Sequence, residues 1–195
     1  MTGFLDRAYD ASSPNETRAL YDDWAATYDA ELGENGYATP ARCAEALARH
    51  APLVEPLLDI GCGTGLSGVA FRARGFGAID GADPSQEMLA KAEATGAYRD
   101  LRLSDPEAPF EAGAYALIAA VGVIGVGAAP AALIDRAWEA LPEGGLLCLS
   151  LNDHALAVGA FTKRIEARRG HILFEEYGPH IPGIDLMSRV YVLRK

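Results

Sequence analysis

The sequence predicts an α/β protein in which strands of a parallel sheet alternate with helices, and three observations lead to this prediction. Short apolar runs recur between residues 56 and 151, and helix-like segments separate them. One of these runs leads into Asp59-Ile-Gly-Cys-Gly-Thr-Gly65, which is typical of a buried strand that turns sharply into a helix. The last two strand-like runs are joined only by residues 178–183, a link too short for a parallel crossover, so this final pair must be antiparallel.

The individual elements follow from capping residues and apolar periodicity. Ser13-Pro-Asn-Glu16 is a capping box, and Thr39-Pro40 is a second helix start, so helices are predicted before the first strand. The predicted strands are residues 56–60, 77–82, 98–103, 115–121, 146–151, 171–177 and 185–193. The predicted helices between them are residues 65–74, 84–95, 130–140 and 155–169. We therefore expect a single domain over residues 1–195, with helices on both faces of the sheet.

Charge and cysteine usage exclude several classes of protein. The net charge is −10, and an acidic surface of this kind repels a phosphate backbone, so no nucleic-acid partner is expected. The three cysteines are widely spaced, which argues against a disulfide framework and a metal site and favours a reducing compartment. Residues 112–134 carry no charge, but glycines and Pro130 interrupt them, so a buried strand and loop are predicted rather than a membrane span. With no secretory signal pattern at the N-terminus, we expect a cytoplasmic protein.

Two motifs at the ends of the first two predicted strands point to a nucleoside cofactor. The glycines at 61, 63 and 65 read G-x-G-x-G, and Leu66 stands where a dinucleotide fingerprint would require a third glycine. A second motif, Gly81-Ala-Asp-Pro-Ser-Gln-Glu-Met-Leu89, places Asp83 18 residues after Gly65. Together the two motifs resemble those of class I methyltransferases that use S-adenosyl-L-methionine. The alternative for the glycines alone is a tight corner without a ligand.

The resemblance extends over nearly the whole chain. Tyr21-Asp-Asp-Trp-Ala-Ala-Thr-Tyr-Asp29 is similar to the Y-D-x-W-A-x-x-Y-D segment of small Williams–Beuren-region methyltransferase-like proteins, and less closely to the opening of quinone-biosynthesis methyltransferases. Leu141-Pro-Glu-Gly-Gly145 resembles the family's L-x-P-G-G element, with Glu143 inserted. The family resemblance implies a seven-stranded Rossmann-like sheet in the order 3-2-1-4-5-7-6 with strand 7 antiparallel. It also implies that residues 1–50 form a helical lid.

The resemblance also implies which residues hold the cofactor at the carboxyl ends of the strands, where open parallel sheets bind ligands. The methionine part would lie against Gly61, Cys62, Gly63 and Gly65, and Cys62 is interpreted as structural rather than nucleophilic. Asp83 would accept from the ribose hydroxyls, with Pro84 opening the helix behind it. The adenine would meet the Ser104–Asp105 turn, and the ammonium would meet the backbone carbonyl of Val121.

For several of these residues a structural role is the alternative. Asp59 either faces the cofactor's ammonium or braces the glycine loop, and Asp105 either contacts adenine or caps a turn. Tyr21 and Tyr28 share a helical stripe with Trp24, so they form either a lid over the cofactor or part of the core. His154 and His180 follow predicted strands at the edge where the cofactor is expected. They are either catalytic residues next to the methyl acceptor or ordinary loop residues.

The most direct functional interpretation is a methyltransferase that acts on a small molecule. The segment after the fourth strand, residues 122–127, lacks the polar N/D-P-P-Y string of enzymes that methylate amino groups of nucleic-acid bases or glutamine. A non-catalytic partner protein with the same fold is the alternative, and a nicotinamide-dependent reductase is disfavoured by Leu66. No metal is expected.

Overall fold

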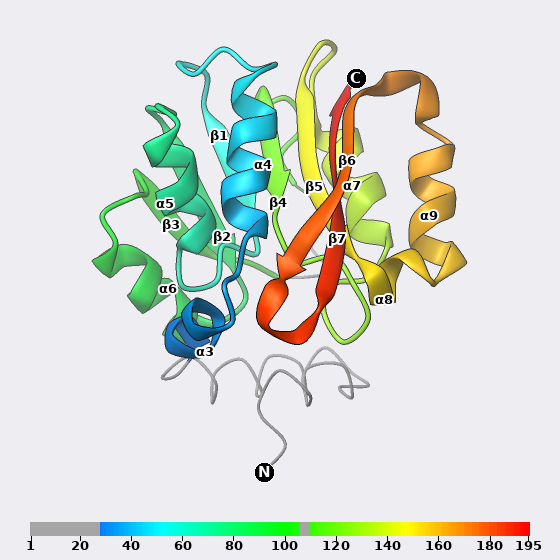
Figure 1. The fold of residues 1–195 in the computed structure, drawn as a ribbon. Helices are drawn as coiled ribbons and strands as arrows, with labels where there is room; N and C mark the ends of the chain where they lie inside the picture. Colours follow the sequence, from blue (N-terminus) through cyan, green and yellow to red (C-terminus); the bar gives the residue numbers. More distant parts are fainter. Residues whose placement is uncertain (1–27, 106–109) are drawn as a thin grey trace.

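The structure, a computed structural model, describes residues 28–105 and 110–195, and its framework is a seven-stranded sheet (Figure 1). The strand order is β3-β2-β1-β4-β5-β7-β6. The strands are β1 (Leu57–Ile60), β2 (Ile79–Asp83), β3 (Asp100–Leu103), β4 (Leu117–Ala120), β5 (Leu146–Asn152), β6 (Ile172–Ile181) and β7 (Leu186–Arg194). β1 to β5 are parallel, and β7 is antiparallel to both of its neighbours. The predicted order and the antiparallel seventh strand are confirmed.

The central strands are buried and largely apolar because both of their faces are covered. In β5, Leu146 and Cys148 face one core, whereas Leu147 and Leu149 face the other. β1, β2 and β4 are buried along their whole length. Near-continuous apolar runs of this kind are expected for parallel strands between two helical layers.

Helices cover both faces of the sheet (Figure 1). The helices of the described chain are α3 (Tyr28–Glu34), α4 (Thr39–Ala48), α5 (Leu66–Ala73), α6 (Gln86–Ala94), α7 (Ala132–Ala140), α8 (Asp153–Leu156) and α9 (Gly159–Glu166). On one face, Leu47 of α4 and Phe71 of α5 are fully buried. On the other face, Ile134 of α7 and Phe161 of α9 pack in the second core. α6 lies against β2 and β3.

The final hairpin differs from the prediction. Gly178–Gly183 was expected to be the link, but β6 continues to Ile181, and the link consists of η2 (Pro182–Ile184) and Asp185. β6 is the last strand of the sheet, so Pro179 needs no hydrogen-bond partner on the outer side. Asp185 takes the tight turn with a φ of 53°. The strand extends past the predicted link because an edge strand tolerates proline.

Two helix boundaries also differ. The predicted helix 155–169 is divided into α8 and α9, because Val158 adopts an extended conformation with φ −103° and ψ 117°. Pro84 was expected in the first turn of its helix, but it precedes the N-cap. The N-cap is Ser85, whose side chain accepts from the Met88 amide at 3.1 Å. A serine cap with that bond outweighs the preference of proline for the first turn.

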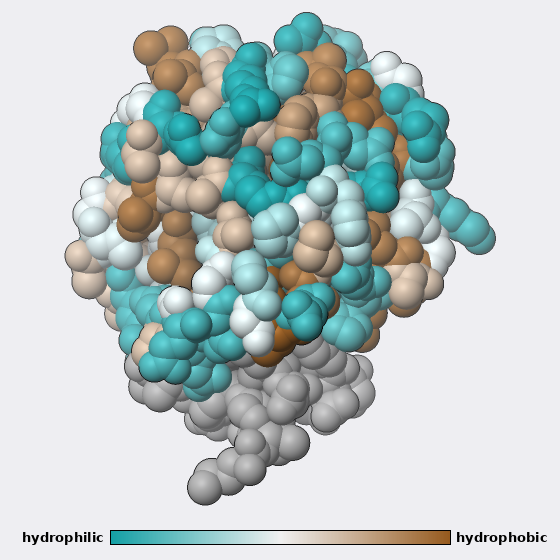
Figure 2. Space-filling model, viewed as in Figure 1, coloured by the Kyte–Doolittle hydropathy of each residue, from teal (hydrophilic) through white to brown (hydrophobic). Residues whose placement is uncertain are grey.

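The N-terminal region contributes α3 and α4 to the described structure, and the capping box at residues 13–16 lies outside it. α4 packs on the sheet, whereas α3 lies at the edge formed by the carboxyl ends of the parallel strands (Figure 1). No described helix is both long and apolar enough to cross a bilayer. On the face that Figure 2 shows, apolar and hydrophilic residues are intermixed.

Candidate functional site

The glycine turn after β1 depends on backbone conformations that favour glycine. Gly61, Gly63 and Gly65 have φ values of 68°, 53° and 97°. The amide of Gly61 donates to the carbonyl of Ala82 at 2.7 Å, which ties the turn to the end of β2. A Cβ on Gly61 would lie 2.3 Å from Val123 Cγ2, whereas a Cβ on Gly63 would have no described atom within 4 Å. The turn is therefore tightly packed at Gly61 and leaves space for a ligand at Gly63.

Asp83 joins the glycine turn to the start of α6. Its Oδ2 accepts from the Gly63 amide at 2.9 Å, and its Oδ1 accepts from the Ser85 amide at 2.9 Å. The side chain is almost fully buried at the end of β2. Each carboxylate oxygen has more than one acceptor position, so the Asp83 carboxylate can also accept from a pair of hydroxyls. The position at the strand end agrees with the sequence interpretation.

Asp59 is fully buried, and the described residues bind only one of its two carboxylate oxygens. Oδ2 accepts from the Ser67 hydroxyl at 2.6 Å and from the Tyr98 hydroxyl at 2.8 Å, so Asp59 does brace the loop and the start of α5. Oδ1 is buried and has no hydrogen-bond partner in the described part of the chain. Burial raises the pKa of Asp59 to about 6, against the opposing effect of the two hydroxyls. A buried acceptor without a partner is costly, and an ammonium group would satisfy it.

Tyr98 is a supporting residue that the sequence analysis did not single out. Its hydroxyl donates to Asp59 and accepts from the Gly68 amide at 3.0 Å. A Cβ on Gly68 would lie 2.3 Å from the Tyr98 ring, so glycine is needed for this close packing. The only signal available in the sequence was Gly68 within the first turns of a predicted helix, where glycine is otherwise unfavourable.

The remaining predicted cofactor residues lie along the same edge. Cys62 is buried, and burial together with the nearby Asp59 raises the pKa of its thiol, which agrees with a structural role. Val121 is buried at the end of β4, and the next amide, of Gly122, donates to the Ser150 hydroxyl at 2.8 Å. At the end of β3, the Ser104 amide donates to the carbonyl of Asp83 at 2.9 Å, and Asp105 is exposed.

α3 connects the glycine turn with the β6–β7 hairpin. Asp29 Oδ1 accepts from the Thr64 hydroxyl at 2.5 Å, and Thr64 belongs to the glycine turn. Leu32 packs with Ile181 and Leu186 of the hairpin. α3 therefore extends along the edge where the cofactor residues lie. Tyr21 and the side chain of Tyr28 fall outside the described part of the structure, so their predicted contacts stay predictions.

The two candidate histidines differ in their surroundings. His180 is 6% exposed, its ring meets Tyr37 edge-on at 5.2 Å, and its Cε1 lies 4.0 Å from the position that a Cβ on Gly122 would take. It therefore lies at the carboxyl end of β4. Burial lowers the pKa of His180 to about 4, and the nearby charge of Arg42 acts in the same direction. His154, on α8, is exposed.

These residues fit S-adenosyl-L-methionine. Oδ1 of Asp59, which no described residue contacts by a hydrogen bond, suits the ammonium, and the carboxylate of Asp83 suits the ribose. The described atoms leave room at Gly63 between them. The described residues contain no cluster of histidine, cysteine or carboxylate side chains suited to a metal ion. Chemically, the edge can hold a cationic nucleoside and align it with an acceptor near Gly122.

Comparisons with solved structures agree with this fold. The [4+2]-cyclase SpnF superposes with a TM-score of 0.70 at 16% identity, over 95% of this chain and 97% of that chain. A Thermoplasma acidophilum protein gives 0.65 at 17% identity, over 81% and 89%. An S-adenosylmethionine-dependent methyltransferase from Mesorhizobium loti gives 0.56 at 17% identity, over 77% and 96%. These likenesses concern the fold.

Sequence comparisons identify the family. The human methyltransferase-like protein 27 is 33% identical over 140 residues, which cover 67% of this chain and 56% of the relative. The chain thus matches about half the length of this curated relative. A family model described as a methyltransferase domain matches residues 33–185. The chain therefore belongs to the methyltransferase domain family, and this membership implies a site for S-adenosylmethionine.

Proposed function

We propose that this protein binds S-adenosyl-L-methionine at the carboxyl ends of β1, β2 and β4 and transfers its methyl group to a small-molecule acceptor. The observation that supports this most strongly is the buried Oδ1 of Asp59 next to the glycine turn, which has no hydrogen-bond partner among residues 28–105 and 110–195. A protein that bound nothing there would gain stability by replacing this carboxylate with a neutral group. A cationic ligand explains why it is retained.

The proposed roles follow from the chemistry of each group. When bound, the cofactor supplies a sulfonium-activated methyl group. Asp83 accepts from the ribose hydroxyls while it holds the Gly63 amide in place. Asp59 accepts from the ammonium through Oδ1. α3 covers the carboxyl-end edge of the sheet, excludes water and helps to align the methyl group with the acceptor. Alignment and exclusion of water are the main contributions a protein makes to such a transfer.

A small acceptor is supported by the charge and by the loop after β4. The net charge of −10 disfavours nucleic acids and anionic membrane surfaces as partners. Residues 122–127 contain only glycine, valine and isoleucine, without the side chains that would recognise an amide or a base. We also propose a cytoplasmic location, because the buried thiols of Cys43, Cys62 and Cys148 suit a reducing compartment.

Two observations support a relationship, within the methyltransferase domain family, to the small Williams–Beuren-region methyltransferase-like proteins. The segment from Tyr21 to Asp29 resembles small Williams–Beuren-region methyltransferase-like proteins, and the human methyltransferase-like protein 27 shares 33% identity with this chain. The alternative remains a non-catalytic protein that binds the cofactor. The fold alone does not decide between them, since a protein named as a [4+2]-cyclase shares it.

Two measurements test the proposal in sequence. S-adenosylmethionine and S-adenosylhomocysteine should each raise the melting temperature, because both bind only the native state, whereas NADH should not. A shift with NADH alone would overturn the assignment of the cofactor.

The second measurement asks whether transfer occurs. Methyl-labelled S-adenosylmethionine is incubated with the protein and a cell extract, and the label is measured separately in the low-molecular-weight and macromolecular fractions. We expect more label in the low-molecular-weight fraction with the wild-type protein than with the Asp83→Ala variant, which is the matched control. Stabilisation by the cofactor without any transferred label would favour the non-catalytic alternative.

A further inference from the structure

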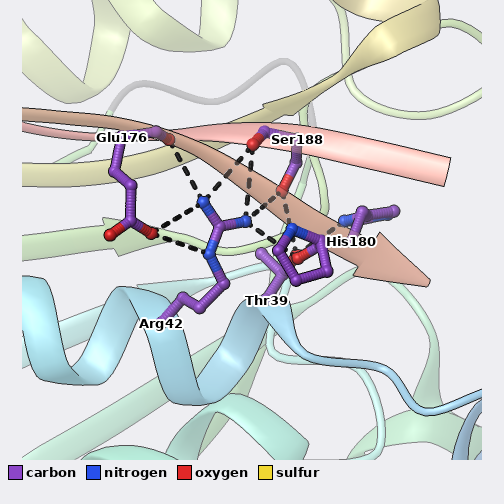
Figure 3. Close-up of polar contacts among 6 residues, drawn as sticks. Thr39, Arg42, Glu176, His180 and Ser188 are labelled. Carbon is purple, nitrogen blue, oxygen red and sulfur yellow. Dashed lines mark hydrogen bonds and ion pairs between the residues drawn. The ribbon is translucent and has the colours of Figure 1, made fainter. Parts of the chain in front are cut away.

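A buried chain of polar side chains leads from α4 through β7 to His180 (Figure 3). Arg42 Nη1 donates to the Ser188 hydroxyl at 2.9 Å. The Ser188 hydroxyl lies 3.2 Å from the Thr39 hydroxyl, which lies 2.7 Å from His180 Nδ1. Thr39 and Ser188 are fully buried. Because these four side chains come from three separate elements, the chain is a product of the fold and not of local sequence.

Arg42 determines one end of this chain, since it is permanently charged and can only donate. Its Nε donates to the Glu176 carboxylate at 3.0 Å, and its Nη1 also donates to the carbonyl of Pro179 at 2.8 Å. Its side chain is 13% exposed. The guanidinium is therefore held in one orientation, with Nη1 directed at the Ser188 hydroxyl.

Counting protons then gives the direction of every bond. Ser188 accepts from Arg42, so its own proton has the Thr39 oxygen as its acceptor in the described structure. Thr39 accepts from Ser188 and therefore donates its own proton to His180 Nδ1. The reverse direction would leave the buried Ser188 proton without an acceptor among the described residues, which is unfavourable. Nδ1 is thus an acceptor, and a neutral ring must carry its proton on Nε2.

The backbone at His180 directs the ring toward the site. Pro179 pairs with Met187 and Ile181 pairs with Leu186, so His180 is the extra residue of a β-bulge. Bulges change the direction of a side chain relative to a regular strand. The carbonyl of His180 accepts from the Ala38 amide at 3.0 Å, which attaches the bulge to the start of α4.

The other nitrogen, Nε2, is available. It has no hydrogen-bond partner among residues 28–105 and 110–195, and it is not among the polar atoms that are sealed from solvent there. The charged and titratable side chains that influence the His180 ring electrostatically are Arg42, Asp153 and His154, and the Tyr37 ring packs against it. None of these accepts a hydrogen bond from Nε2.

We propose that the Arg42–Ser188–Thr39 chain holds His180 as its Nε2-protonated tautomer, and that Nε2–H donates to an oxygen of the methyl acceptor. His180 would then bind and orient the substrate, and it would not act as a general base. The acceptor class is a molecule with an oxygen lone pair at this point, such as a carboxylate, carbonyl or phenolate. The lowered pKa of His180 agrees with a neutral ring near pH 7. Only the placement of the acceptor depends on the proposed function.

The tautomer can be tested on the protein without any ligand. Nuclear magnetic resonance of isotope-labelled histidine distinguishes protonated from unprotonated ring nitrogens, and His180→Gln identifies the signal among the four histidines. We expect a neutral ring protonated at Nε2 at pH 7. Thr39→Val, which removes the donor to Nδ1, should reduce this preference, and Ser188→Ala should reduce it less. Thr162→Val on α9 is the control and should change nothing.

These results decide the first half of the proposal independently of methyl transfer. A ring protonated at Nδ1, or doubly protonated at pH 7, would overturn it. An Nε2 preference that survives in Thr39→Val would show that the chain does not set the tautomer. Neither result bears on whether the protein binds S-adenosylmethionine.

The donor role is tested with two probes that share a ring and differ in their polar group, benzoate and benzylamine. With S-adenosylhomocysteine present, benzoate should shift the Nε2 proton resonance and benzylamine should not. His180→Gln, which keeps an N–H donor, should retain most of the benzoate affinity, and His180→Phe should lose about tenfold. Equal benzoate binding by His180→Phe, or no shift with benzoate, would refute the donor role.

Discussion

Replacing Asp59 with asparagine should stabilise the ligand-free protein while it impairs cofactor binding. The carboxylate is fully buried, and one of its oxygens has no partner in the described structure. Asparagine keeps an oxygen that can accept from Ser67 and Tyr98 but carries no charge. The substitution therefore removes the burial of a charge and preserves the brace of the loop.

The magnitude follows from the pKa of Asp59, which burial raises from an ordinary value of 3.8 to about 6. A folded-state pKa above the unfolded one means that stability is fully present below the unfolded pKa and is lost as pH rises through the folded one. At pH 8 this loss is about 3 kcal/mol, and at pH 5 it is about 1.5 kcal/mol. The buried amide of asparagine costs about 1 kcal/mol. The expected net gain is therefore about 2 kcal/mol at pH 8 and about 0.5 kcal/mol at pH 5.

The assay is urea denaturation of both proteins at pH 5 and pH 8, followed by titration with S-adenosylhomocysteine. We expect the gain in the free energy of unfolding to grow with pH and the affinity to fall. Asp80→Asn is the matched control. Burial tends to raise the pKa of Asp80, but bonds from Arg99 and Tyr115 lower it overall. The control should therefore destabilise the protein at pH 8. A gain from Asp59→Asn that is independent of pH, or a loss at pH 8, would refute the reasoning.

Three further predictions concern the same edge. Asp83→Ala should weaken S-adenosylhomocysteine binding more than tenfold by calorimetry, because charge-assisted hydrogen bonds are worth roughly 1.5–3 kcal/mol each, and unchanged affinity would remove Asp83 from the site. Gly61→Ala should lower the free energy of unfolding by about 1–3 kcal/mol, because the new Cβ would overlap Val123 and the residue would keep a positive φ. Gly170→Ala is the control, since a Cβ there meets no described atom, and it should cost under about 1 kcal/mol. Equal effects of the two substitutions in urea denaturation would contradict this prediction. Hydrogen exchange of residues 28–34 should slow when S-adenosylhomocysteine binds, and exchange that stays the same would argue against a lid.

Most of the fold could be predicted from the sequence because the signals for its strands, turns and helices are local. Apolar runs, glycines and caps located the strands, and the two motifs located the turns that hold Asp59 and Asp83. The structure departs from the prediction where context overrides local preference. Pro179 is compatible with β6 only because that strand lies at the edge, and Val158 interrupts a segment whose composition suits a helix.

The polar chain that ends at His180 was not predictable from the sequence. Thr39 and His180 are separated by 141 residues, and Thr39 and Ser188 by 149. Each residue type has an ordinary local explanation, as a helix start, a loop histidine or a strand serine. Only the return of β7 between β5 and β6 brings them together.

The described attachments of α3 differ in strength at its two ends, and this difference has a consequence for how the edge can open. At the amino end, the described link is one hydrogen bond from Thr64 to the exposed Asp29, worth about 1–2 kcal/mol. At the carboxyl end, the burial of Leu32 contributes about 1.5–3 kcal/mol. There the Gly183 amide also donates to the Asn35 carbonyl at 2.9 Å. By these described contacts the amino end of α3 is attached more weakly, so we expect the helix to separate first beside the glycine turn and to stay attached at the β6–β7 hairpin. Such an opening would let the nucleoside exchange while the contacts that hold His180 stay in place.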